Sequence, residues 1–340
     1  MFVERYRVRF DWSILLLVAA LLLTSVSVSA QDYTIEEYNE YQDAVAKGED
    51  AMIAFIQGHP DSSLNQYVVA AYQQKLNDYS TNAQWNQAYE AGKKFLDTVG
   101  TDLVPADNEN RSLILAVTTW AAYNSQHYAE AAAFGSKLYE VQPNTDNLVM
   151  ILARSYLNAG DVGNAVKWGE KYCSTVTPEN CFDILPTLMR YYAEQKKWAT
   201  ASKYAQQTID ALAKAPKPAQ VSEAEWKKYT NEEVSVAHTI IGRSAFESKK
   251  WSTCEKNYSS VFSLTPANHE RNAEAHYYIG MSRWSQDQID PAMEAFARGV
   301  AQGNTPYKET CQKQLEKLYR ATHNGSLAGL DELLERATTG

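Results

Sequence analysis

Apolar and small residues recur along the chain in a frame that is clearest between Ile279 and Gly299. Ile279-Gly280 is followed by a polar turn, and then by Ala292, Phe296 and Gly299 at intervals of four and three residues. Intervals of three and four place side chains on one face of an α-helix. The stretch therefore predicts two helices joined by a short turn.

The same frame recurs along most of the chain. Ile241-Gly242 and Leu152-Ala153 begin units that keep both halves, and three further segments keep the second half. A small residue then recurs at separations of 43, 34, 36, 53 and 38 residues, and an apolar residue three positions earlier is predicted to cap the inter-helix turn. A period in the middle thirties with two helical patterns per unit is typical of a helix-pair solenoid. The small residues, which let the paired helices approach closely, are Ala88, Ala131, Ala165, Ala201, Cys254 and Ala292.

This frame resembles the tetratricopeptide repeat, whose consensus runs Trp…Leu-Gly…Tyr…Gly-x-Tyr…Ala…Phe…Ala…Pro. The match is good in the units at Leu152 and Ile279, fair around Ile241 and weak at Trp85. The resemblance covers roughly residues 33–337. It implies an all-α fold, a right-handed helix-pair solenoid of about six repeats with N- and C-terminal capping helices. It also implies a protein that assembles complexes and catalyses no reaction.

Residues 1–30 have the pattern of a signal peptide. Arg5, Arg7 and Arg9 precede an apolar run, and Val28 and Ala30 fit the small-residue cleavage pattern. We expect cleavage after Ala30, which would leave residues 31–340 as an exported chain, periplasmic or secreted, with no membrane segment. The alternative is an uncleaved anchor. Cysteine does not follow the cleavage site, which disfavours a lipoprotein.

Helix start and stop signals divide the remaining chain. Thr34 and Glu37 form a predicted capping box at the start of the array. The segment near 213–232 is predicted to be an insertion. Two prolines lie within Ala213–Ala219, and a helix cannot continue through them. Ser222 and Glu225 then begin a helix that is predicted to reach Ser248, and helices over 307–322 and 326–337 close the array.

Composition excludes several classes of function. The 340 residues carry a formal net charge of −9. Generic nucleic-acid binding needs a basic surface, and the net charge gives no indication of one. The six histidines form no HExxH motif, and the chain has neither a Gly-x-Ser-x-Gly motif nor a phosphate-binding glycine loop with Lys-Ser/Thr. We predict a protein that is not an enzyme, with no catalytic residues, no metal and no cofactor.

Four cysteines remain in a chain that is expected to be exported. Cys173 and Cys181 are separated by one predicted turn, so their Cα atoms can come within disulfide range. A bridge there would join adjacent repeats, and two free thiols are the alternative. Cys254 fills a small-residue position, where a buried thiol behaves much like alanine. A Cys254–Cys311 bridge is the other interpretation.

The residue after the Leu-Gly position faces the concave groove in the fold that the resemblance implies. In successive units it is Trp120, Arg154, Arg190, Arg243 and Met281. Three arginines in one column favour bidentate binding of carboxylates, as in an acidic peptide or a C-terminal tail. The other side chains expected in the groove are Tyr123, Leu157, Asn158, Phe246, Tyr277 and Trp284.

A structural interpretation of the same arginines competes with the binding one. Arg190 is followed four residues later by Glu194, and Arg243 by Glu247, whereas Arg154 is followed by Asn158. Glutamate and arginine at this offset form ordinary helix-surface pairs of a few tenths of a kcal/mol. The column does not match the lysine and asparagine carboxylate clamp of chaperone-binding tetratricopeptide proteins.

We expect an exported scaffold or adaptor that binds a protein or peptide in its concave groove, and the arginine column favours an acidic partner. The alternative is a component of cell-envelope assembly or secretion that acts through its convex face or end repeats. A third class, an enzyme or ligand carrier, would require a pocket at the insertion near 213–232.

Overall fold

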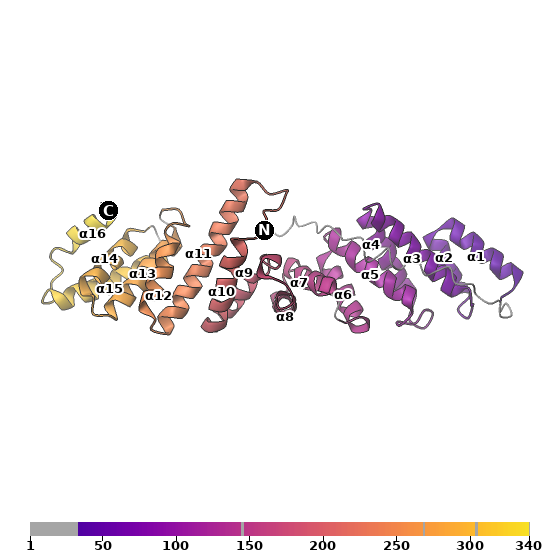
Figure 1. The fold of residues 1–340 in the computed structure, drawn as a ribbon, viewed down its shortest axis with the longest axis horizontal. Helices are drawn as coiled ribbons and strands as arrows, with labels where there is room; N and C mark the ends of the chain where they lie inside the picture. Colours follow the sequence, from indigo (N-terminus) through magenta and orange to yellow (C-terminus); the bar gives the residue numbers. More distant parts are fainter. Residues whose placement is uncertain (1–32, 144–145, 268, 303–304, 340) are drawn as a thin grey trace. The chain divides into compact units, whose positions relative to one another are not determined.

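The computed structural model describes residues 33–143, 146–267, 269–302 and 305–339 (Figure 1). The predicted signal peptide, residues 1–30, lies outside these ranges. Every regular element of the described residues is helical, with sixteen α-helices and one short 3₁₀-helix. None of the described helices is both long enough and apolar enough to cross a membrane.

The helices belong to two compact units, residues 1–168 and 169–340, and α8 runs across the boundary. The first unit contains α1 (Ile35–Lys47), α2 (Glu49–Gly58), α3 (Asn65–Thr81), α4 (Trp85–Thr98), α5 (Glu109–Asn124), α6 (Tyr128–Val141), α7 (Asp146–Asn158) and the start of α8 (Val162–Cys173). The second contains the 3₁₀-helix Pro178–Asn180, α9 (Leu185–Glu194), α10 (Trp198–Leu212), α11 (Glu223–Glu247), α12 (Trp251–Val261), α13 (Glu270–Trp284), α14 (Ile289–Ala301), α15 (Pro306–Thr322) and α16 (Leu330–Thr339).

Neighbouring helices form stacked pairs within each unit. From α1 to α7, and again from α9 to α15, each helix contacts the next one along the chain. Odd-numbered helices also contact one another, α3 with α5 and α5 with α7 in the first unit, and α9 with α11, α11 with α13 and α13 with α15 in the second. This is the nearest-neighbour packing of a helical repeat array. The predicted all-α helix-pair architecture is confirmed.

The second helix of each predicted unit begins where the frame places it. All six small-residue positions, including Cys254, are buried. Each of these helices begins three residues before its small residue. The apolar residue that was predicted to cap the turn is therefore the first residue of the helix. These first residues are Trp85, Tyr128, Val162, Trp198, Trp251 and Ile289.

The predicted capping signals operate at two helix starts. The Thr34 hydroxyl accepts a hydrogen bond from the Glu37 backbone N–H at 3.1 Å at the start of α1. Ser222 and Glu225 form a reciprocal capping box at the start of α11. Helix α11 then continues without a break for 25 residues to Glu247, as the sequence predicts.

Candidate functional site

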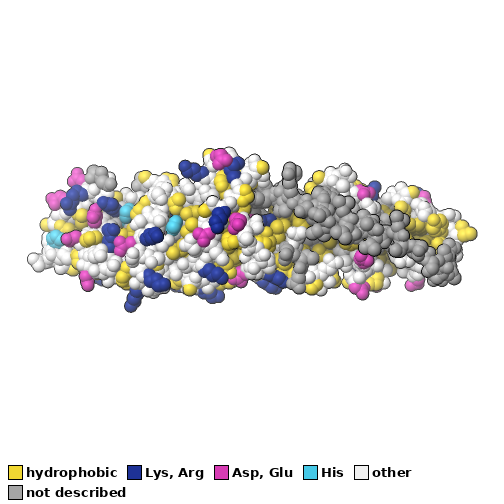
Figure 2. Space-filling view, in the orientation of Figure 1, with side chains coloured by type: hydrophobic (Ala, Val, Ile, Leu, Met, Phe, Trp, Pro, Cys, Tyr) yellow, Lys and Arg dark blue, Asp and Glu magenta, His cyan; other side chains and the backbone are white. Residues whose placement is uncertain are grey.

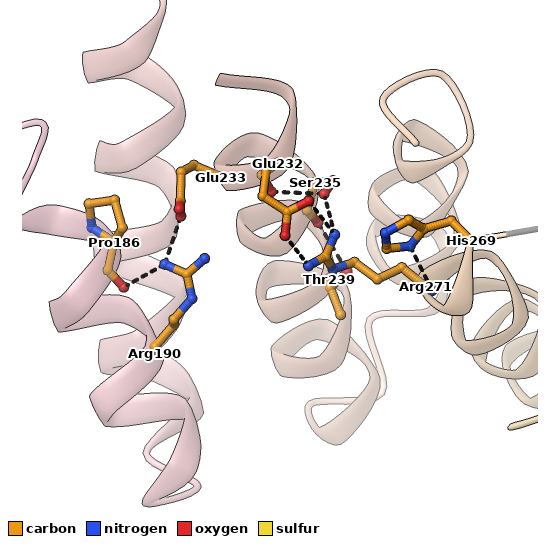
Figure 3. A network of polar contacts seen from close by, with 8 residues as sticks. All are labelled: Pro186, Arg190, Glu232, Glu233, Ser235, Thr239, His269 and Arg271. Carbon is orange, nitrogen blue, oxygen red and sulfur yellow. Dashed lines mark hydrogen bonds and ion pairs between the residues drawn. The ribbon is translucent and has the colours of Figure 1, made fainter. Parts of the chain in front are cut away.

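The odd-numbered helices of the second unit carry the polar contacts drawn in Figure 3. Arg190 on α9 lies with its Nη1 atom 2.7 Å from Glu233 Oε2 on α11, and the same nitrogen donates to the Pro186 carbonyl at 3.4 Å. The contact with Glu233 is an ion pair without the alignment of a hydrogen bond. Glu233 is 9% exposed, so this pair neutralises a buried carboxylate. The predicted pairing of Arg190 with Glu194 is wrong, because Glu233 takes its place.

A second arginine joins the next two odd-numbered helices. Arg271 on α13 binds the Glu232 carboxylate on α11 through both terminal nitrogens, and Nη1 also donates to the Ser235 hydroxyl at 3.1 Å (Figure 3). The hydrogen bond from Arg271 holds the pKa of Glu232 below its ordinary value, although partial burial opposes this. The His269 ring accepts a hydrogen bond from the Arg271 backbone N–H at 3.2 Å. Helices α9, α11 and α13 are thus linked by ion pairs.

Arg243 lies further along α11 and contacts both charge and aromatic rings. Its Nη2 atom is 2.7 Å from Glu247 Oε1, which confirms the predicted i,i+4 pair. Its guanidinium also lies 4.7 Å from the ring centroid of Tyr278 and 5.4 Å from that of Trp198. Cation–π contacts of this kind add to the stability of the packed helices.

Two of the first-unit residues that were predicted for the groove are largely enclosed. Arg154 is 8% exposed and Tyr123 is 5% exposed. The Asn158 side chain donates to the Arg154 carbonyl at 2.8 Å, and the Trp120 carbonyl accepts from Asn124 at 2.9 Å. The expectation that Arg154 and Tyr123 line an open groove is therefore wrong, because a buried guanidinium or ring presents little surface to a partner.

The aromatic side chains predicted on α11 and α13 are only partly covered. The ring centroids of Phe246 and Tyr278 lie 5.1 Å apart, and those of Tyr277 and Tyr307 lie 5.5 Å apart. Lys317 lies 5.2 Å above the Trp284 ring. We call three partly buried aromatic side chains and one partly buried methionine of α11 and α13 the aromatic wall. Its members are Phe246, Tyr277, Met281 and Trp284.

The cysteines separate into a bonded pair and two buried thiols. The structure joins Cys173, the last residue of α8, to Cys181 in a disulfide with 5.7 Å between the Cα atoms. Cys254 and Cys311 are free and buried, and burial raises the pKa of each thiol to about 12. A thiol with so high a pKa stays protonated and is a poor nucleophile. The Cys254–Cys311 bridge considered from the sequence is absent among the described residues.

One open groove lies in the first unit, and the sequence analysis did not predict it. It has a volume of about 540 Å³ and lies between the start of α2, Tyr79 near the end of α3, and residues 87–97 of α4. The Tyr79 hydroxyl donates to Glu49 at 2.5 Å inside it, and the Lys94 ammonium pairs with Asp50. Within the described parts of the chain, no three His, Cys, Asp or Glu side chains cluster in a way that could hold a metal ion.

Comparison with known proteins gives structural matches only. The sequence matches no known protein-family profile and none of the curated proteins. A tetratricopeptide repeat protein from Parabacteroides merdae ATCC 43184 aligns at 12% identity over 84% of this chain and 96% of its own, with a TM-score of 0.32. NprR in complex with its cognate peptide NprX aligns at 12% identity over 88% and 87%, with a TM-score of 0.33. The tetratricopeptide repeat domain of P58(IPK) aligns at 13% identity over 89% and 97%, with a TM-score of 0.31.

Proposed function

We propose that this chain is an exported, non-catalytic scaffold that binds a protein or peptide segment on the odd-numbered helices of its second unit. The observation that carries the proposal is the aromatic wall on α11 and α13. Its four large side chains pack against the buried core and are themselves only partly buried. Aromatic and methionine side chains are enriched in the cores of protein interfaces, because they offer large contact areas at low entropic cost.

The ion pairs on α9 and α11 argue against an acidic partner. An acidic partner requires arginines that are available to bind it, yet Arg190 pairs with Glu233 and Arg243 with Glu247. A new carboxylate would have to displace the existing one or share the guanidinium with it. We therefore propose that apolar side chains of the partner contact the aromatic wall. The arginines then stabilise the packing of neighbouring helices rather than bind the partner.

A photo-crosslinking experiment in the native host tests this proposal. A photoreactive phenylalanine analogue replaces Met281 on α13 in one variant and Lys256, an exposed residue of α12, in a control. We expect a specific crosslinked partner from position 281 and none from position 256. Crosslinking from position 256 with none from position 281 would contradict the proposal. Circular dichroism of both variants checks that helicity is retained.

The alternative function, in cell-envelope assembly or secretion through the end repeats, also has an observation in its favour. The first helix, α1, leaves large apolar side chains exposed, with Ile35 82% accessible. Such exposure is uncommon for a surface that meets only solvent. Crosslinking from Ile35, rather than from Met281, would favour this alternative.

A further inference from the structure

Helix α1 leaves an apolar face uncovered at the start of the array. Ala44 is the one buried residue of this helix. Ile35, Tyr38 and Val45 are 82%, 41% and 36% exposed, and Tyr67 at the start of α3 is 45% exposed. The separations of three and seven residues place the three α1 side chains on one side of the helix. We call these four residues the α1 face.

Ring contacts support one member of the α1 face, Tyr38. Tyr38 stacks on Tyr33 at 5.8 Å and contacts Tyr41 at 5.9 Å. Tyr41 in turn meets the edge of buried Phe55 at 6.3 Å. Burial raises the pKa of Tyr41, and Tyr38 and Tyr67 raise it further. Because Tyr38 already packs against two rings, binding would cost little entropy for this side chain.

The surrounding charge is strongly acidic. Residues 33–143 contain 15 Asp and Glu but 6 Lys and Arg, a formal charge of −9, whereas residues 146–339 contain 23 of each. The excess negative charge of the described residues therefore lies in the first unit. Figure 2 shows magenta side chains with little dark blue on the uncovered surface of α1–α4, and both colours interspersed over α9–α16. Glu36 and Glu40, both exposed, lie on α1 itself.

We propose that the α1 face is a docking surface for a cationic amphipathic segment of another protein. The apolar side chains of that segment would cover Ile35, Tyr38 and Val45, and its lysines or arginines would lie near Glu36. Opposite charge accelerates and orients such an encounter. A second copy of this unit, or an anionic membrane, would meet like charge at the same face. This surface is independent of the aromatic wall of the second unit and goes beyond the function proposed for it.

Binding of a defined peptide tests this proposal on the full-length protein. The probe is an 18-residue amphipathic helix of leucine and lysine, and its negative counterpart contains glutamate in place of lysine. One variant combines Ile35→Ser, Tyr38→Ser and Val45→Ser. A control variant combines Val141→Ser and Val162→Ser, which removes two apolar side chains that are 42% and 47% exposed elsewhere in the first unit. Neither variant changes the net charge.

We expect the lysine peptide to bind the wild type and the control variant equally, and the triple variant about tenfold or more weakly. The glutamate peptide should not bind. Equal binding of the lysine peptide to all three proteins would show that charge alone attracts it, and would overturn the proposal. So would wild-type dimerisation that the triple variant abolishes, or wild-type binding to phosphatidylglycerol vesicles that it abolishes. Matched thermal unfolding curves establish that the triple variant is folded.

Discussion

The Phe296 ring lies directly against the backbone of Gly280, on the facing helix of the same repeat. A Cβ atom at position 280 would lie 2.6 Å from Phe296 Cε1, closer than real Cβ contacts allow. Tyr258 has the same relation to Gly242, at 2.7 Å from Cδ2. In both pairs, the missing side chain of the first helix makes room for the ring of the second.

Gly280→Ala should therefore destabilise the protein although alanine favours helices. The added methyl group must displace the Phe296 ring or separate the helices, and overpacking of this kind costs about 1–3 kcal/mol. Urea unfolding measures the change. Gly163→Ala in α8 is the control, because its nearest neighbouring atom would lie 3.8 Å away. Equal stability of the two variants would contradict the close-packing account.

The turn within each repeat contains a residue with a left-handed backbone. It lies two residues before the start of the second helix in all six units. Five of these residues are not glycine, and left-handed φ is unfavourable for residues with a Cβ. The six residues are Ala83, Gln126, Gly160, Lys196, Lys249 and Asp287.

Lys249→Gly should stabilise the protein, since φ at this position is +57°. Relief of the left-handed strain is expected to exceed the entropic cost of glycine by up to about 1 kcal/mol. Gly160→Ala, at φ +78° with open space around it, should destabilise by a similar amount for the opposite reason. Thermal unfolding of both variants and the wild type shows whether each substitution raises or lowers the stability. A loss of stability in Lys249→Gly would contradict this explanation.

Local sequence rules predicted the helices but not these turns. Trp198 and Trp251 begin their helices as the frame predicts, because apolar spacing determines which side chains can be buried together. Lys196 and Lys249 carry no turn signal, since neither is glycine, asparagine or aspartate. Their left-handed backbone is imposed by the packing of the two helices that they connect. Residue propensities therefore do not predict the left-handed backbone at these positions.

The candidate site shows the same limit. The offset rule found Glu247 as the partner of Arg243 correctly. It failed for Arg190, because Glu233 is distant in sequence and reaches α9 only through the stacking of α11. The resemblance to the tetratricopeptide repeat placed Arg154 in an open column, yet the fold buries it. Partners on neighbouring repeats depend on tertiary register, which a single sequence does not reveal.

Arg190→Gln should destabilise the second unit by leaving the buried Glu233 carboxylate without its cation. The Arg190 side chain is 37% exposed, so we expect about 1–3 kcal/mol rather than the larger cost of a fully buried pair. Adding Glu233→Gln should restore part of the loss. A double-mutant cycle by urea unfolding measures the coupling. Arg298→Gln, which removes an exposed pair with Glu294, should change stability by less than about 0.5 kcal/mol. Additive effects of Arg190→Gln and Glu233→Gln would contradict the role of the Arg190–Glu233 pair.

Stability should fall as pH decreases through the range from about 6.5 to about 4, in part because of His276. Burial lowers the pKa of this ring to about 4, with Arg298 and Arg283 acting in the same direction, and the ring stacks on Phe262 at 4.4 Å. Below pH 6.5 the unfolded chain takes up a proton that the folded ring excludes. The loss is about 1.4 kcal/mol per pH unit, or about 3.5 kcal/mol in total.

His276→Gln should reduce that pH dependence, whatever its effect on stability at pH 7. The measurement is the free energy of unfolding at several pH values between 4 and 7. His323→Gln, at an exposed histidine, should keep the wild-type slope. An unchanged slope in His276→Gln would show that other groups account for the pH dependence.

The most direct test of the central proposal is co-purification of a partner from the native host with two variants that are both folded at the temperature of the assay. Met281→Ser with Trp284→Ala opens the aromatic wall, and Arg190→Gln with Arg243→Gln removes two paired arginines while leaving the wall. We predict that the first variant loses the partner and the second retains it. Loss of the partner from the arginine variant, with retention by the wall variant, would contradict the proposal and restore the arginines as the binding site.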